Sequence, residues 1–193
     1  MWPAHRRSSF AGSEVSQILI STLVLGLAFT LATRGGWQFF IVALVTVGVG
    51  FVGHELAHKY AAMRFGYSAS YRIWPMGLVL ALILAFVARL IFAALGAVQI
   101  YGPGMSRDER GVISLSGPVF NVALAAVFMG LAALFGGGFY GFFNFGAQIN
   151  ALIALFNCIP FAILDGKKIF DWDKSVWLLA VGAAGTLFLM TWF

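Results

Sequence analysis

The chain has 193 residues, of which 61% are hydrophobic and 10% are charged, and its formal net charge is +5. A soluble domain has about 45–50% apolar and about 25% charged residues, so this composition excludes a water-soluble protein and indicates an integral membrane protein. The positive charge does not indicate nucleic-acid binding, because the bases cluster in short loops between apolar runs, where they set topology. The single cysteine, Cys158, excludes a disulfide within the chain.

Taken in chain order, five segments are long and apolar enough to cross a bilayer as helices, which requires about 20 residues. They are Val15–Thr33, Trp37–Met63, Ile113–Phe135, Phe142–Leu164 and Ser175–Trp192. The first follows the basic stretch HRRSS, but its end, LATRGG, lacks the small-x-small cleavage site of a signal peptide. We therefore expect a retained helix there.

A further apolar block, Met76–Ile100, is interrupted by Arg89 and ends in the alternating sequence GAVQIYGPG. Lys and Arg concentrate in cytoplasmic loops of membrane proteins. The loop at Arg34 has one base and the loop at Gly136–Gly138 has none, whereas the base-rich segments contain Arg6, Arg7, Lys59, Arg64, Arg72, Arg107, Arg110, Lys167, Lys168 and Lys174. A block that crosses once would put two of these base-rich segments outside, whereas a block that enters and leaves on one side makes all of them cytoplasmic.

The charge pattern therefore favours the second topology, with a cytoplasmic N-terminus. We expect an all-α polytopic membrane protein with five to six transmembrane helices and a membrane-embedded re-entrant or β-hairpin element at about residues 76–100. Non-helical backbone at membrane depth must pack beside protein or a water-filled cavity, so a cavity is expected at this element. The alternative is that residues 76–100 form an ordinary sixth helix.

The sequence HELAH, residues 54–58, matches H-E-x-x-H. On a helix, His54 and His58 lie on one face and can bind one metal ion, while Glu55 can take a proton from a metal-bound water. The alternatives are coincidence or two hydrogen-bonded core histidines. Ionisable groups at membrane depth cost roughly 2.5–3.5 kcal/mol each and are functional by default, which favours the metal interpretation.

Catalytic zinc usually has three protein ligands, so a third must come from elsewhere in the chain. Asp165 ends a long apolar run, unlike the acids of the polar loops, and the re-entrant topology places it near the same membrane face as the two histidines. The alternative is a turn aspartate before Gly166. The other acids are Glu14, Asp108, Glu109, Asp171 and Asp173.

Two asparagines lie in apolar segments near these residues. Asn121 closes the sequence SGPVFN, in which Gly117 and Pro118 permit close helix approach, and Asn157 lies one turn before Pro160. Their amides suit contact with a substrate carbonyl. The alternative is helix-to-helix hydrogen bonding, worth about 0.6–2 kcal/mol in membranes.

The segments HELAH, SGPVFN and NCIPFAILDG resemble the three signatures of the site-2 protease family of intramembrane zinc metalloproteases. The resemblance covers a core of helices at about 37–63, 113–135 and 142–165 within a single domain, residues 1–193, without room for a PDZ or nucleotide-binding domain. It implies one Zn²⁺ per chain, held by His54, His58 and Asp165, with Glu55 as catalytic acid and base. Structural roles at the site fall to the remaining motif residues: Gly117, Pro118, Pro160 and Gly166.

The resemblance further implies that Asn121 and Asn157 hold the substrate strand or stabilise the oxyanion, and that GAVQIYG forms a strand that pairs with an unwound substrate. The implied reaction is peptide-bond hydrolysis within or near a transmembrane helix. The expected partners are a transmembrane-helix protein substrate and the lipid bilayer, at the cytoplasmic side of the cell membrane, with the first and last spans as a gate. The rival hypotheses are a metal transporter or sensor and an inactive relative that binds helices.

Overall fold

The computed structural model describes residues 12–161 and 163–193, so the basic pair Arg6 and Arg7 lies outside the described residues. Within them, four helical stretches are long and apolar enough to cross a membrane: Gly12–Thr33, Trp37–Arg64, Arg107–Phe135 and Gly137–Asn157. The prediction of a helical membrane protein is therefore confirmed. The predicted fifth span forms a shorter apolar helix, α8 (Lys174–Met190), so the count of five to six remains a prediction.

The first helix, α1, spans Gly12–Thr33. The second stretch begins as α2 (Trp37–Ala43), widens into a π-helical turn, η1 (Leu44–Gly48), and continues as α3 (Val49–Arg64). The long helix α5 covers Arg107–Phe135 and begins with a capping box between Ser106 and Glu109. A short 3₁₀ turn, η2 (Gly137–Phe139), leads into α6 (Tyr140–Asn157).

The end of α6 differs from the expected core helix at about 142–165. The helix stops at Asn157, and Asp165 is the first residue of a separate helix, α7 (Asp165–Trp172). Pro160 explains the difference, because it lacks a backbone donor and clashes with the preceding turn. The correction to the predicted core helix is that it ends before Pro160 and that Asp165 begins a new helix beyond it.

Residues 76–100 form two different structures. Pro75–Ala88 is a helix, α4, that ends where Arg89 adopts a left-handed φ of 55°. Gly96–Tyr101 is a strand, β2, which confirms the strand expected at GAVQIYG. Its antiparallel partner β1 (Ser68–Ile73) was not predicted, since it lies before the element expected at about residues 76–100.

The pairing of the two strands brings the two ends of this segment together. Ile73 pairs with Gly96, so α4 and the irregular stretch after it begin and end at the same point. A single crossing would separate these two ends by the thickness of a membrane. The two ends of the segment lie together, which agrees with the expected re-entrant element, and that element remains a prediction.

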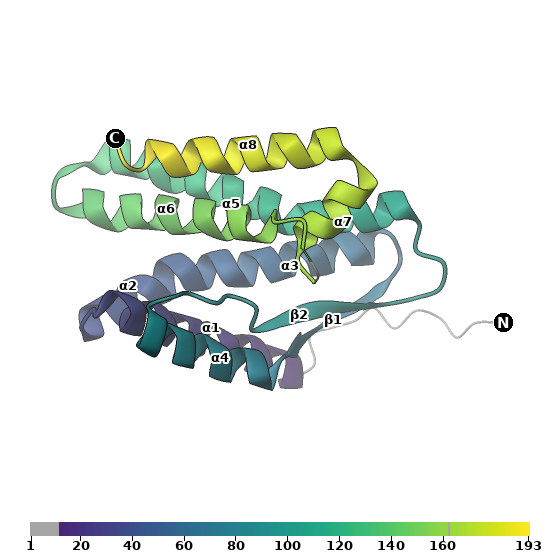
Figure 1. Cartoon of the computed structure of the whole chain (residues 1–193), viewed down its shortest axis with the longest axis horizontal. Helices are drawn as coiled ribbons and strands as arrows, with labels where there is room; N and C mark the ends of the chain where they lie inside the picture. Colours follow the sequence, from purple (N-terminus) through teal and green to yellow (C-terminus); the bar gives the residue numbers. More distant parts are fainter. Residues whose placement is uncertain (1–11, 162) are drawn as a thin grey trace.

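The three helices predicted to form the core correspond to α3, α5 and α6, and they lie side by side (Figure 1). Helix α3 packs against α5, which packs against α6, and α8 lies beside α6 on the far side. On the other face of α3 lie the β1–β2 pair and, beyond it, α1 and α4. Helix α3 therefore lies between a layer of α5, α6 and α8 and a layer of β1, β2, α1 and α4.

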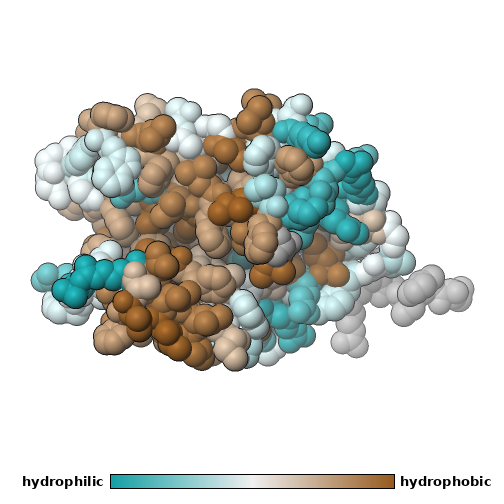
Figure 2. Space-filling view, viewed as in Figure 1, coloured by the Kyte–Doolittle hydropathy of each residue, from teal (hydrophilic) through white to brown (hydrophobic). Residues whose placement is uncertain are grey.

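Apolar side chains cover the middle of the molecule and hydrophilic ones collect toward its ends (Figure 2). Large aliphatic and aromatic residues are exposed on the outer helices, including Leu19 on α1 and Leu179 on α8, which are 56% and 73% exposed. A soluble monomer rarely exposes contiguous apolar patches of this extent. The surface is therefore that of a protein whose outer helices face lipid.

Candidate metal centre

His54 and His58 lie one turn apart on α3 and point in the same direction, as the i, i+4 spacing requires. Their Nε2 atoms are 3.0 Å apart. Both side chains are buried, with exposed fractions of 4% and 8%. The helix thus presents two imidazole nitrogens side by side in the interior of the protein.

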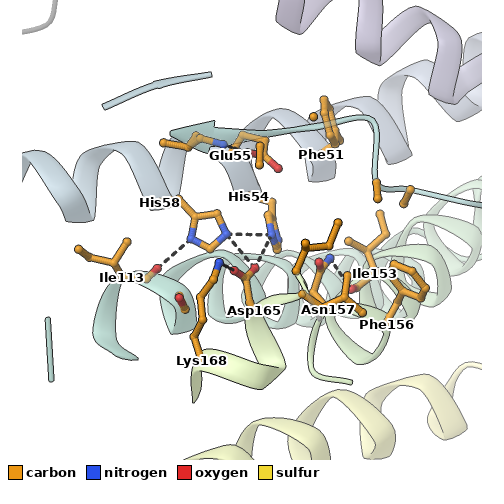
Figure 3. Close-up of a pocket in the computed structure, with 18 of the residues that line it drawn as sticks. Phe51, His54, Glu55, His58, Ile113, Ile153, Phe156, Asn157, Asp165 and Lys168 are labelled. Atoms are coloured by element: carbon orange, nitrogen blue, oxygen red, sulfur yellow. Dashed lines mark hydrogen bonds and ion pairs between the residues drawn. The ribbon is translucent and has the colours of Figure 1, made fainter. Parts of the chain in front are cut away.

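Asp165 reaches the same point from the start of α7 (Figure 3). Its Oδ2 atom lies 3.3 Å from His54 Nε2 and 3.0 Å from His58 Nε2. Zinc bonds of about 2.0–2.1 Å in a tetrahedral site separate neighbouring ligand atoms by about 3.3 Å. The three atoms therefore form a triangle of nearly the size that three vertices of a zinc tetrahedron would have, and one position remains for water.

The protonation pattern also suits a cation. His58 Nδ1 lies 2.8 Å from the carbonyl oxygen of Ile113, which can only accept, so Nδ1 holds the proton and the neutral ring has its lone pair on Nε2. Burial alone would raise the pKa of Asp165, but its interactions with His58 and His54 hold that pKa well below its usual range. An ionised carboxylate and imidazole lone pairs are the donors that Zn²⁺ binds.

A lysine faces the other oxygen of the same carboxylate. Lys168 Nζ lies 3.4 Å from Asp165 Oδ1, leaving Oδ2 for the histidine side. The sequence had indicated Lys168 only as a base at the membrane border. The signal that could have identified it is its i+3 spacing from Asp165, which places both on one face of a helix.

Glu55 lies beside the three clustered residues, 8% exposed. Its Oε2 accepts a hydrogen bond of 3.2 Å from the backbone N–H of Val98 on β2. Figure 3 shows β2 passing across the cavity next to Glu55, while His54 and His58 face Asp165. The strand had been predicted, but not its contact with Glu55, because a backbone donor has no signature in the sequence.

One cavity of about 120 Å³ joins these groups. Its polar wall contains the two histidines, Glu55 and Asp165, and its remaining wall is mostly apolar. The lining residues include Phe51 on α3, Ala97 on β2, Ile153 on α6 and Lys168 on α7. A volume of this size holds several water molecules or one amino-acid side chain.

The two candidate asparagines occupy different places. Asn157 lines the cavity, and its amide nitrogen donates to the carbonyl of Ile153. Asn121 is fully buried behind the histidines, and its Oδ1 lies 2.6 Å from His54 Nδ1. The position of Asn157 suits contact with a substrate, whereas Asn121 contacts the far side of a metal-ligand candidate.

Two glycines of the motifs bring the elements together. A Cβ at Gly166 would lie 2.1 Å from the carbonyl oxygen of Cys158, so glycine lets α7 begin against the end of α6. Pro118, within α5, is buried beside Gly117. A Cβ at Gly117 would lie 2.5 Å from His58 Nε2 and 2.6 Å from His54 Nε2. The absent side chain at Gly117 therefore leaves the space in which the imidazole nitrogens lie.

Replacing Gly117 with alanine is expected to weaken zinc binding by at least about tenfold, as disturbing the shell around a metal does. The added methyl group would displace both imidazole nitrogens, while alanine suits the helix better than glycine. Zinc affinity measured by competition with a chelator checks the expectation. Gly130→Ala in the same helix is the control, because a Cβ there meets open space; equal zinc affinity in the two variants would contradict it.

Fold and site together define a helical membrane protein with a buried site for a divalent metal. A curated protein of Methanocaldococcus jannaschii, named "Putative zinc metalloprotease MJ0611", is 36% identical over 187 residues, which cover 95% of this chain and 97% of the relative. "Putative zinc metalloprotease YwhC" of Bacillus subtilis is 29% identical over 157 residues, or 66% of this chain and 67% of the relative. No family model and no solved structure matches the chain.

The chain belongs to the zinc metalloprotease family of these relatives. The cluster of His54, His58 and Asp165 agrees with that assignment, since its donor atoms all lie within 4.8 Å of one another and suit zinc. The predicted family is therefore confirmed at the level of zinc metalloproteases.

Proposed function

We propose that the protein is an intramembrane zinc metalloprotease of the site-2 protease type, which hydrolyses peptide bonds within or near transmembrane helices of membrane-protein substrates. One observation supports this most directly. The cluster of His54, His58 and Asp165 lies buried among apolar helices long enough to cross a membrane, with Glu55 in the same cavity. A metal site inside such a bundle suits a substrate that is itself in the membrane.

Each side chain has a definite part in this reaction. His54, His58 and Asp165 would hold one zinc ion, which lowers the pKa of a bound water to about 7 and polarises the scissile carbonyl. Glu55 takes the proton of the attacking water and passes it to the leaving amine. Asn157, whose amide lines the cavity, is the better placed of the two asparagines to contact the substrate backbone.

Strand β2 is the proposed platform for the substrate. One edge of β2 pairs with β1, and Gly96, Ala97 and Val98 line the cavity. A transmembrane helix hides its carbonyl groups, so the substrate must unwind before cleavage. An unwound segment can add to a strand through main-chain hydrogen bonds, which also aligns it along the metal centre.

The arrangement of segments supports the proposed orientation in the cell membrane. The end of α3, the start of α5 and helix α7 lie at one end of the molecule, which Figure 1 shows on the right. Most of the predicted base-rich segments adjoin these elements. By the positive-inside rule this end faces the cytoplasm, the protein crosses the membrane several times, and residues 76–100 re-enter from that side. Access between the first and last spans remains a prediction.

Zinc and cleavage are tested together with an Asp165→Ala variant. Wild-type protein co-expressed with a set of single-span membrane substrates should cut at least one of them, and a zinc chelator should stop the reaction. Asp165→Ala should lose both zinc and cleavage, because two ligands hold the ion poorly. Asp171→Ala is the control, since this aspartate lies exposed on the same helix and pairs with Lys167. Full zinc content in Asp165→Ala would remove Asp165 from the ligand set.

A further inference from the structure

A chain of two buried amides lies behind the metal centre, on the side away from the cavity. Asn150 on α6 and Asn121 on α5 are both fully buried. They connect the ring of His54 to backbone carbonyls of three helical segments. The sequence had not singled out Asn150, which is surrounded by apolar residues in QINALIALFN.

The orientation of Asn150 is set by backbone. Its amide nitrogen donates to the carbonyl of Gly146 at 2.9 Å and to that of Thr46, in the π-helical turn η1, at 3.3 Å. Carbonyl oxygens only accept hydrogen bonds, so the NH₂ end of the side chain must face them. The Oδ1 atom of Asn150 is thereby directed at Asn121.

The orientation of Asn121 follows from that of Asn150. Its amide nitrogen donates to Asn150 Oδ1 at 2.9 Å and to the carbonyl of Gly50 at 3.1 Å. Its remaining group, Oδ1, lies 2.6 Å from His54 Nδ1 and can only accept. Nδ1 must therefore hold the proton, and the lone pair of neutral His54 is on Nε2, the atom that faces Asp165 and His58.

Gly50 provides the space for this chain. A Cβ at Gly50 would lie 2.0 Å from Asn150 Oδ1 and 3.3 Å from Asn121 Nδ2. Any side chain at this position of α3 would push the two amides apart. The glycine and the two asparagines come from three different elements, and they meet only at this point.

We propose that Asn150 is a positioning residue that keeps His54 in its Nδ1-protonated form through Asn121. The inference rests on the proposed function, in which His54 binds zinc through Nε2. Which imidazole nitrogen binds a metal is set by the hydrogen bond that the other nitrogen makes. If Asn150 is lost, only the hydrogen bond to the Gly50 carbonyl still opposes a half-turn of the Asn121 amide, which would present its NH₂ group to His54. That rotation favours the wrong tautomer.

The experiment compares Asn150→Leu with Asn144→Leu. Asn144 lies on the same helix, and its amide nitrogen donates to the carbonyl of Thr191 at 3.0 Å, at the opposite end of α6 from the metal centre. Two readouts apply: zinc affinity by chelator competition, and the ¹⁵N chemical shifts of the histidine rings in zinc-free protein. Asn150→Leu should weaken zinc binding by about 10–100-fold, the range for residues that orient metal ligands, and should mix the His54 tautomers. Asn144→Leu should change neither.

A rescue variant separates positioning from general stability. Both oxygens of a carboxylate accept hydrogen bonds, so Asn121→Asp presents an acceptor to His54 Nδ1 in either orientation, although it loses the hydrogen bond to the Gly50 carbonyl. Adding Asn121→Asp to Asn150→Leu should restore the Nδ1-protonated tautomer of His54. It does not replace the hydrogen bonds that Asn150 makes to Gly146 and Thr46, so it should not restore stability. Asn150→Ala, which adds no bulk, serves as a second variant if leucine prevents folding.

Wild-type zinc affinity and a single tautomer in both Asn150 variants would overturn the inference, as would an equal loss in Asn144→Leu. Neither readout involves proteolysis. A failure of the protease proposal would appear as absent cleavage or absent zinc in the wild type, and the tautomer of His54 in zinc-free protein would still test the role of Asn150.

Discussion

A Glu55→Gln variant is expected to bind zinc as tightly as the wild type and to lose cleavage by a factor of about 10²–10⁴, the usual contribution of a general acid–base group. The amide of glutamine cannot accept a proton from water. It can still accept the hydrogen bond from Val98 N–H that Glu55 Oε2 accepts at 3.2 Å, so β2 should stay in place. Cleavage of a co-expressed single-span substrate and zinc content of the purified protein are the two measurements.

The same variant decides among the rival hypotheses. A metal transporter needs no general base next to its ligands, and an inactive relative would tolerate the loss of Glu55. The substrate should remain bound to Glu55→Gln and co-purify with it, because the cavity and β2 are unchanged. Cleavage at the wild-type rate would refute the protease assignment. Loss of zinc would instead mean that Glu55 supports the metal centre.

The cluster of His54, His58 and Asp165 could be predicted because helical periodicity and the distribution of charge can both be read directly from the sequence. The i, i+4 spacing alone puts His54 and His58 on one face of α3, and the topology predicted from the distribution of Lys and Arg places Asp165 near the same membrane face. The contact of Asn121 with His54 was not predictable, since it depends on how α5 is rotated about its axis against α3. Tertiary packing sets that rotation.

The second difference between prediction and structure is the end of α6. The length of the apolar run predicted a helix continuing to Leu164 in spite of Pro160, because hydropathy does not distinguish a helix from an apolar turn. The seven residues between α6 and α7 are what allow Asp165 to turn back toward His54.

Glu14 is the clearest case of a residue whose role could not be predicted from the sequence. The sequence placed it just before the first span, where a solvated carboxylate would be ordinary. In the structure it is 4% exposed, and its oxygens lie 2.8 and 2.6 Å from Nζ of Lys59, the residue that follows His58 on α3. Glu14 Oε1 also accepts from the backbone N–H of Tyr71 on β1 at 2.9 Å. One carboxylate thus joins α1, α3 and β1.

Replacing Glu14 with alanine is therefore expected to lower the free energy of unfolding by about 3–5 kcal/mol, the usual cost of removing one partner of a buried ion pair. The lysine would lose its two contacts with this carboxylate, and the backbone N–H of Tyr71 would lose the acceptor Oε1. Reversible unfolding in mixed detergent micelles measures the change. Because β1 holds β2 against the cavity, the variant should also cut substrate more slowly at temperatures where it remains folded.

A double variant tests whether charge or packing is responsible. Glu14→Gln with Lys59→Met removes both charges, keeps an acceptor for Tyr71 N–H and preserves the side-chain volumes. Uncharged replacements of a buried pair are often neutral or stabilising, so the double variant should regain most of the stability that Glu14→Ala loses. If it unfolds as readily as Glu14→Ala, the ion pair itself stabilises the junction of α1, α3 and β1. If it is stable and still cuts substrate, the junction needs only its shape and the hydrogen bond to Tyr71 to hold β2 beside the metal centre.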